Sequence, residues 1–167
     1  MSKAPVILLA SLIGCLSAVH AGYVPDACMN CICYVESHGC HMPDPLCRMD
    51  VGSLSCGPFQ MKLGYWQDAR LKGGPLMNDW KTCAASWTCS RDAVNGYMER
   101  YAVPSRLGHG PTCEDFSRIH NGGPNGFKNP ATLAYWGRVK KCLGGGPELN
   151  EIGLEQNAQT KNHTKLG

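Results

Sequence analysis

The cysteines constrain the fold of this chain more than any other feature of its sequence. The 167 residues include 11 cysteines, and ten of them follow residue 22: Cys28, Cys31, Cys33, Cys40, Cys47, Cys56, Cys83, Cys89, Cys113 and Cys142. An even number of cysteines in an exported chain predicts a framework of five disulfides, whose pairing the order alone leaves open. Together with 20 glycines, this framework favours a small cross-linked domain over a coiled coil or a long helical bundle.

The N-terminal segment predicts export from the cell. Lys3 precedes an apolar stretch over residues 6–14, and small residues then lead to Val19-His20-Ala21, which fits a signal-peptidase site. We therefore expect residues 1–21 to be a signal peptide, and the mature protein to be secreted and extracellular without Cys15. The apolar stretch is too short for a membrane span, and no later segment resembles one. The alternative to a signal peptide is therefore that this stretch forms a hydrophobic first helix of the core.

The first cysteines also allow a metal-binding interpretation. A zinc site would take its ligands from the cysteines and histidines of one segment: Cys28, Cys31, Cys33, His38, Cys40 and His41. Disulfides are the preferred interpretation, because zinc ligands usually come as two separated pairs and because secreted thiols oxidise. A redox role for Cys28-x-x-Cys31 is disfavoured, since no βαβ pattern surrounds it. The sequence thus predicts no metal and no cofactor.

Helical patterns cover most of the presumed mature domain, residues 22–143. Asp26 is suited to cap a helix that begins at Ala27 and ends at His38-Gly39, with Glu36 at its C-terminal edge. Further helical segments are predicted at 65–70, at 77–86, from a Ser90 cap to Pro104, over 113–120 after a Thr112 cap, and from Asn129-Pro130 to Lys140-Lys141.

One segment predicts β structure. Residues 40–48 have the composition of a loop, and residues 49–62 show short alternating runs broken by glycine, which predicts a small hairpin. Residues 144–167 lack aromatic side chains and predict a flexible tail that carries a glycosylation sequon at Asn162. The predicted fold class is α+β and α-rich, a small disulfide-stapled domain with one short β hairpin.

Two carboxylates differ in their predicted surroundings. Glu36 ends an apolar, cysteine-rich helix, whereas Asp50 begins the hairpin beside Gly52 and Ser53. Apolar packing raises the pKa of a carboxyl group through desolvation, and hydroxyl and backbone N–H groups favour the ionised form. Glycoside hydrolysis needs this asymmetry, because one carboxyl group protonates the leaving oxygen while the other meets the cationic sugar.

Several segments together resemble the invertebrate-type, or destabilase-type, lysozymes. The similar segments are Cys31–Ser37, Met49–Gly57, Tyr65-Trp66 and Arg118–Pro124, and the match runs from Cys28 to Cys142. The resemblance implies a lysozyme-like fold and hydrolysis of the β-1,4 bond between N-acetylmuramic acid and N-acetylglucosamine in bacterial peptidoglycan, for antibacterial defence, digestion or both. By motif position, Glu36 matches the general acid and Asp50 the second carboxylate of a retaining mechanism.

The same resemblance suggests residues that bind the sugar. Tyr65, Trp66 and Ser53 are candidates to line the groove, because aromatic rings pack against the apolar faces of sugars; core packing is the alternative for both aromatic residues. His120 and Asn121 are candidates on the substrate side, with a plain helix end as the alternative for that turn.

Two further functions compete with the lysozyme hypothesis. Some members of this family cleave ε-(γ-Glu)-Lys isopeptide bonds through a serine assisted by a lysine or a histidine, which here would be Ser53 or Ser55 with Lys62 or His120. The other alternative is a non-catalytic carbohydrate-binding domain on the same scaffold, and the presence of both carboxylates argues against it.

The net charge of the chain bears on its expected partners. A formal charge of +3 is too small and too scattered to predict nucleic-acid binding, although it favours an anionic polymer such as peptidoglycan.

The sequence departs from the family pattern at three positions. Ala69 and Phe127 stand where the family is expected to have cysteines, so the framework here has fewer disulfides, and Pro58 replaces an expected aromatic residue after Gly57. No pattern in the sequence indicates an oligomeric state.

Overall fold

The computed structural model of the protein describes residues 23–70, 76 and 79–145. The predicted signal peptide with Cys15, the sequon at Asn162 and the remainder of the predicted tail lie outside these residues. Within the described ranges, no helix has the length and apolar character needed to cross a membrane.

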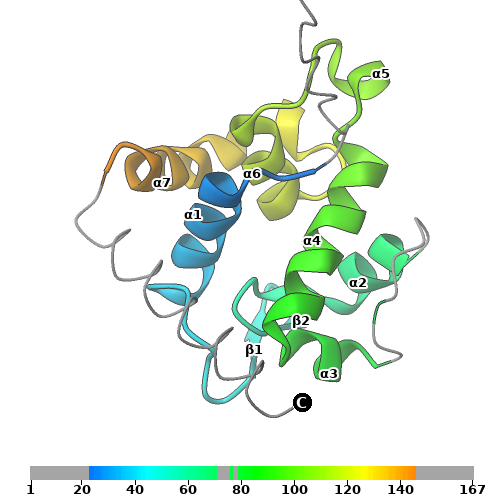
Figure 1. Cartoon of the computed structure of the whole chain (residues 1–167), viewed down its shortest axis with the longest axis vertical. Coiled ribbons are helices and arrows are strands. Elements are labelled where there is room, and N and C mark those ends of the chain that lie inside the picture. The colour runs from blue at the N-terminus through cyan, green and yellow to red at the C-terminus, as the bar shows by residue number, and fades with distance from the viewer. Residues whose placement is uncertain (1–22, 71–75, 77–78, 146–167) are drawn as a thin grey trace, which may run out of the picture.

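Helices form most of the domain, and a small sheet lies at one end of them (Figure 1). The α-helices are α1 (Asp26–Ser37), α2 (Leu63–Arg70), α3 (Trp80–Ala84), α4 (Trp87–Tyr101), α5 (Pro104–Leu107), α6 (Cys113–Gly122) and α7 (Leu133–Leu143). Two 3₁₀ turns, η1 (Gly126–Lys128) and η2 (Pro130–Thr132), connect α6 to α7. The strands β1 (Cys47–Asp50), β2 (Ser53–Cys56) and β3 (Met61–Lys62) form an antiparallel sheet in the order β1-β2-β3. The predicted α-rich α+β class is confirmed, and the sheet gains a third strand beyond the expected hairpin.

Helix α1 passes through the core, and disulfides join it to its neighbours. Cys28, Met29, Cys31, Ile32 and Cys33 are at most 2% exposed. Among the described residues the five disulfides are Cys28–Cys113, Cys31–Cys142, Cys33–Cys40, Cys47–Cys56 and Cys83–Cys89. The first two tie α1 to α6 and α7, so these three helices are held together in a fixed arrangement. The pairing also uses the four cysteines proposed as zinc ligands, which removes the basis of the zinc alternative.

Several element boundaries differ from the sequence predictions. Helix α1 starts at Asp26 itself, with Pro25 before it, rather than at Ala27. Helix α4 is capped by Ser86, whose side chain accepts the backbone N–H of Cys89, and not by Ser90. Ser90 instead lies buried within α4 and donates its hydroxyl to carbonyls at the end of α3. The Cys83–Cys89 disulfide holds these two helices close, which explains why a polar residue is accommodated inside the helix.

Two further differences involve short elements. Pro104 was predicted to end the preceding helix; in the structure it also begins α5, where a proline suits the first helical turn. Cys47 and Arg48 belong to β1 rather than to the predicted loop, because Cys47 pairs with Cys56 across the hairpin. The strand thus starts earlier because of a cross-strand contact, whereas α5 follows from the local preference of proline.

The hairpin turn determines where Asp50 lies. Asp50 is opposite Ser53 in the register of β1 and β2, and only Val51 and Gly52 connect them. Both connecting residues have positive φ, 43° and 75°, as in the two-residue turns that match the twist of antiparallel strands. The Val51 side chain is 93% exposed, so the turn projects into solvent while Asp50 stays fixed at the end of β1.

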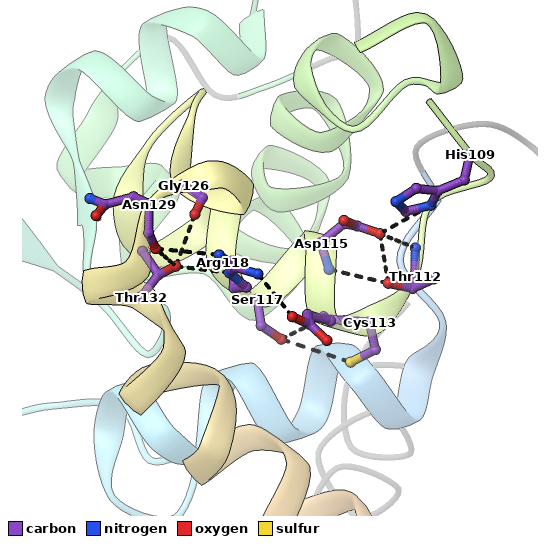
Figure 2. Close-up of polar contacts among 10 residues, drawn as sticks. His109, Thr112, Cys113, Asp115, Ser117, Arg118, Gly126, Asn129 and Thr132 are labelled. Carbon is purple, nitrogen blue, oxygen red and sulfur yellow. Dashed lines mark hydrogen bonds and ion pairs between the residues drawn. The ribbon is translucent and has the colours of Figure 1, made fainter. Parts of the chain in front are cut away.

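A polar network on α6 fixes the segment that leads to α7 (Figure 2). At the start of α6, Thr112 and Asp115 form a reciprocal capping box. Further along, the Arg118 guanidinium donates to the Thr132 hydroxyl, at 3.0 Å, and to the Glu114 carboxylate. The Thr132 hydroxyl lies within 2.8 Å of the backbone carbonyls of both Gly126 and Asn129. These contacts orient η1 and η2, and therefore set the position of α7 relative to α6.

Removal of the Thr132 hydroxyl tests this network. Thr132 is 2% exposed, so Thr132→Val keeps the side-chain shape but leaves buried partners without a hydrogen bond. We expect a loss of about 1–3 kcal/mol in the free energy of unfolding, measured by urea denaturation with the disulfides intact. Thr82→Val, at an exposed threonine whose hydroxyl also bonds a side chain, is the control and should change stability by about 0.5 kcal/mol or less. Equal effects of the two substitutions would contradict the role of the network.

Candidate active site

A cleft of about 760 Å³ lies between the sheet and the helices. Its lining includes most of the residues that the sequence predicted for the site: Glu36, Asp50, Ser53, Ser55, Lys62, Tyr65, His120 and Asn121. They come from α1, all three strands or their edges, α2 and α6, so residues far apart in the sequence meet in one place. A cleft of this size accommodates a chain of sugar units that remains open to solvent.

Glu36 is the buried acid of the cleft. Its side chain is 17% exposed, and burial raises its pKa from 4.5 to about 7, against the opposing effects of the Tyr135 hydroxyl and of Arg138 and Arg48. Glu36 also stands in the last turn of α1, where the negative end of the helix dipole disfavours a carboxylate. Glu36 therefore keeps its proton as pH rises toward about 7, as a general acid must.

His120 contacts Glu36 as a neutral ring. Its Nε2 lies 3.1 Å from the Phe59 carbonyl oxygen and 3.5 Å from Glu36 Oε1. Because a carbonyl only accepts, Nε2 carries the hydrogen, and Nδ1 then accepts from the Tyr65 hydroxyl at 3.1 Å. Burial lowers the pKa of His120 to about 4 and raises the pKa of Tyr65, which stays protonated. An uncharged His120 leaves Glu36 without a counter-cation at this distance, so the acid keeps its proton.

Asp50 has the opposite environment. Its side chain is 51% exposed, and Lys62 Nζ lies 3.1 Å from Oδ2 and 2.7 Å from the Asp50 backbone oxygen. The Ser55 hydroxyl donates to the same Oδ2 at 3.4 Å. Both side-chain contacts fall on one oxygen, so the other oxygen of Asp50 remains available to a ligand.

The two carboxyl groups thus differ in charge within one cleft. Glu36 is buried and protonated, Asp50 is solvated and paired with a cation, and the charge of Asp50 itself raises the pKa of Glu36. An acid and a carboxylate in one sugar-sized cleft can protonate a leaving oxygen and stabilise the positive charge that develops on the sugar.

Comparison with known proteins identifies the family of this chain. The destabilase family profile matches residues 25–142. This chain belongs to the destabilase family, the invertebrate-type lysozymes. A lysozyme of Meretrix lusoria is 46% identical over 74% of this chain and 93% of its own length. An invertebrate-type lysozyme of Ruditapes philippinarum is 47% identical over 74% of this chain and 85% of its own, and invertebrate-type lysozyme 3 of Caenorhabditis elegans is 41% identical over 75% and 91%.

Solved structures of this lysozyme family share the fold. The inhibitor-bound lysozyme of Meretrix lusoria is 45% identical and superimposes with a TM-score of 0.61, over 72% of this chain and 91% of the other. The Tapes japonica lysozyme gives a TM-score of 0.62 at the same identity and coverage. The lysozyme-like fold that the sequence predicted is therefore confirmed.

Two residues that the sequence associated with the groove lie in the core of this lysozyme fold. Trp66 is 5% exposed and does not line the cleft, and Arg70 lies over its ring at 4.6 Å. Pro58 is also fully buried, so its side chain does not alter the groove. The tryptophan that lines the cleft is Trp80, whose indole N–H donates to the Met61 carbonyl at 3.1 Å.

Several lining residues escaped the sequence analysis. Tyr135 and Arg138 lie one turn apart on α7, and Arg48 lies on β1. Tyr135 is 3% exposed, and its buried hydroxyl acts on the pKa of Glu36 without a hydrogen bond of regular geometry. The pair of a buried tyrosine and an arginine three residues later, on a helix joined to α1, is the signal that could have indicated α7.

The predicted isopeptidase residues make different contacts. Ser55 is 1% exposed and donates to Asp50, and Lys62 contacts the same carboxylate. Within the described ranges no side-chain hydrogen bond joins Ser53 or Ser55 to Lys62 or His120, and both nitrogens of His120 are occupied. Ser55 and Lys62 are opposite each other in the register of β2 and β3, but both side chains contact Asp50, and the isopeptidase activity stays a sequence prediction.

The raised pKa of Glu36 makes a prediction about stability. A carboxyl group whose pKa is higher in the folded than in the unfolded protein stabilises the fold below the unfolded value, and this contribution is lost as pH rises through about 7. Compared with wild type, Glu36→Gln should gain up to about 3 kcal/mol in the free energy of unfolding between pH 4.5 and pH 8. Urea denaturation at both pH values measures the difference.

The control for this measurement is Glu99→Gln, which makes the same substitution at an exposed residue of α4 outside the cleft. A difference between Glu36→Gln and wild type that is constant across this pH range would contradict the burial of an acid at Glu36.

Proposed function

We propose that this protein is a secreted lysozyme that hydrolyses the β-1,4 bond between N-acetylmuramic acid and N-acetylglucosamine in bacterial peptidoglycan. The chain belongs to a family whose curated relatives are lysozymes, which supports glycoside hydrolysis. The disulfide framework supports an oxidising, extracellular location. Cleavage of bacterial walls in that location would serve defence, digestion or both.

The observation that carries the proposal is the contrast between Glu36 and Asp50. A pKa raised by burial to about 7 supports Glu36 as the proton donor, and the exposed, lysine-paired Asp50 supports the role of second carboxylate. The roles divide because the surroundings differ, since burial raises the pKa of one carboxyl group while the other lies beside solvent and a lysine.

The proposed reaction proceeds in two steps. Glu36 gives its proton to the glycosidic oxygen as the bond to the sugar C1 breaks, and the Asp50 carboxylate stabilises the cationic C1 or binds it covalently. Ionised Glu36 then takes a proton from water, the hydroxide attacks C1, and Glu36 returns to its protonated form. Asp50 is released unchanged, and the sugar retains its configuration. His120 holds Glu36 in place without adding charge, and Ser55 and Lys62 orient Asp50.

The proposal is tested by removing each carboxylate. We expect mature wild type to clear a peptidoglycan suspension and to release muramyl fragments with new reducing ends, identified by mass analysis. Glu36→Gln and Asp50→Asn should each lower the rate at least about 100-fold, because proton transfer and electrostatic stabilisation of transition-state charge each contribute about this much in a typical enzyme. Glu99→Gln, outside the cleft, is the control and should retain the wild-type rate.

The pH dependence gives a second test of the same site. Wild-type activity should fall as pH rises through about 7, because Glu36 then loses the proton that it donates. Folded wild type that releases no sugar fragments would overturn the proposal, as would full activity in Glu36→Gln.

A further inference from the structure

Cations outnumber ionised carboxylates in the cleft. Arg48, Lys62 and Arg138 line it together with Glu36 and Asp50. Glu36 holds its proton up to about pH 7 and His120 is neutral, so at mildly acidic and neutral pH three cations face one carboxylate. A neutral polysaccharide needs no such excess of positive charge, whereas an acidic one is attracted by it.

The partners of these three cations show which of them is available. Lys62 is engaged with the Asp50 side chain and backbone. Arg48 donates one N–H to the backbone oxygen of Glu36 at 3.2 Å, at the C-terminal end of α1, and keeps its other N–H groups. Arg138 is different, because within the described ranges its guanidinium has neither a hydrogen bond nor a carboxylate at ion-pair distance.

Arg138 is nevertheless directed toward the cleft. Its guanidinium lies over the Tyr135 ring, 5.4 Å from the ring centre, and Tyr135 is itself buried beside Glu36. Arg138 is exposed, but it lines the same cleft as Glu36, and its positive charge lowers the pKa of Glu36. The Cys31–Cys142 disulfide joins α7 to α1, so it restrains the helix that carries Arg138 relative to the helix that carries Glu36.

We propose that Arg138, with Arg48 beside it, forms a carboxylate-binding subsite that selects glycan strands carrying an acid group next to the bond that is cut. This inference rests on the proposed function and deepens it. A guanidinium presents paired N–H groups that match the two oxygens of a carboxylate. In peptidoglycan that carboxylate has two sources: the lactyl group of a muramic acid without a peptide, or an acidic residue of the stem peptide.

The test compares acidic and neutral versions of one substrate. Peptide-free strands of alternating N-acetylglucosamine and N-acetylmuramic acid are cleaved before and after their lactyl carboxylates are reduced to alcohols. Strands that carry stem peptides are cleaved with the peptide carboxylates free or amidated. We expect wild type to prefer the acidic form in at least one of these pairs, and the pair that shows the preference identifies the source of the carboxylate.

Arg138→Gln should remove this preference. We expect its kcat/KM to fall about tenfold on the acidic strands, mainly through KM, and less than twofold on the neutral ones, as for the loss of a charged hydrogen bond. Arg138→Lys should restore part of the preference. Lys141→Gln makes the same charge change on α7 outside the cleft, and should keep the wild-type ratio of acidic to neutral rates.

A binding measurement separates the subsite from catalysis. Free N-acetylmuramic acid should bind Glu36→Gln more tightly than N-acetylglucosamine does, and adding Arg138→Gln should abolish the difference. If Arg138→Gln lowered kcat/KM equally on acidic and neutral strands and left the binding of N-acetylmuramic acid unchanged, the proposed subsite would be overturned. Arg138 would then act only through its effect on Glu36. Failure of wild type to cleave any strand would instead refute the proposed function.

Discussion

The burial of Glu36 between α1, α6 and α7 is the interaction on which the rest of the site depends. An acid with its proton at neutral pH requires a surrounding that excludes water and adds no positive charge at contact distance. His120 supplies the contact from α6 and Tyr135 from α7. Both helices are joined to α1 by disulfides, at Cys28–Cys113 and Cys31–Cys142. The cross-links therefore do more than stabilise a small domain, because they hold the walls of the acid pocket.

The sheet serves the other carboxylate by a different physical means. Asp50 ends β1, and its partners Ser55 and Lys62 face each other on β2 and β3. Hairpin register therefore delivers a hydroxyl and an ammonium group to one carboxylate oxygen. The surroundings of Glu36 are set by helices that exclude solvent, whereas those of Asp50 are set by polar contacts on an exposed edge of the sheet. This separation lets one cleft hold two carboxyl groups in opposite states of protonation.

The sequence predicted those features that local patterns determine. Cysteine number, the approximate extent of α1, the Thr112 cap of α6 and the glycine-containing hairpin follow from residues close together in the chain, and the family motifs brought Glu36 and Asp50 forward. Features that depend on tertiary contacts were missed. Ser90 resembles a cap, but in the structure it lies inside α4 and bonds the end of α3. Trp66 was a groove candidate but lies in the core, and Trp80 lines the cleft instead, because burial is decided by packing. Arg138 was missed since its importance arises only where α7 meets α1.

The opposite pKa shifts of Glu36 and His120 have a consequence for folding itself. Between about pH 4.5 and 6.5, an unfolded chain carries a proton on the histidine and none on the glutamate, whereas the folded protein has the reverse. Folding then transfers one proton between two side chains that end up in contact, with no net exchange with solvent. Since the pH dependence of stability follows net proton uptake, the two slopes cancel within this range. The fold can thus maintain a strongly perturbed acid without becoming sensitive, through this pair, to moderate acidification of its surroundings.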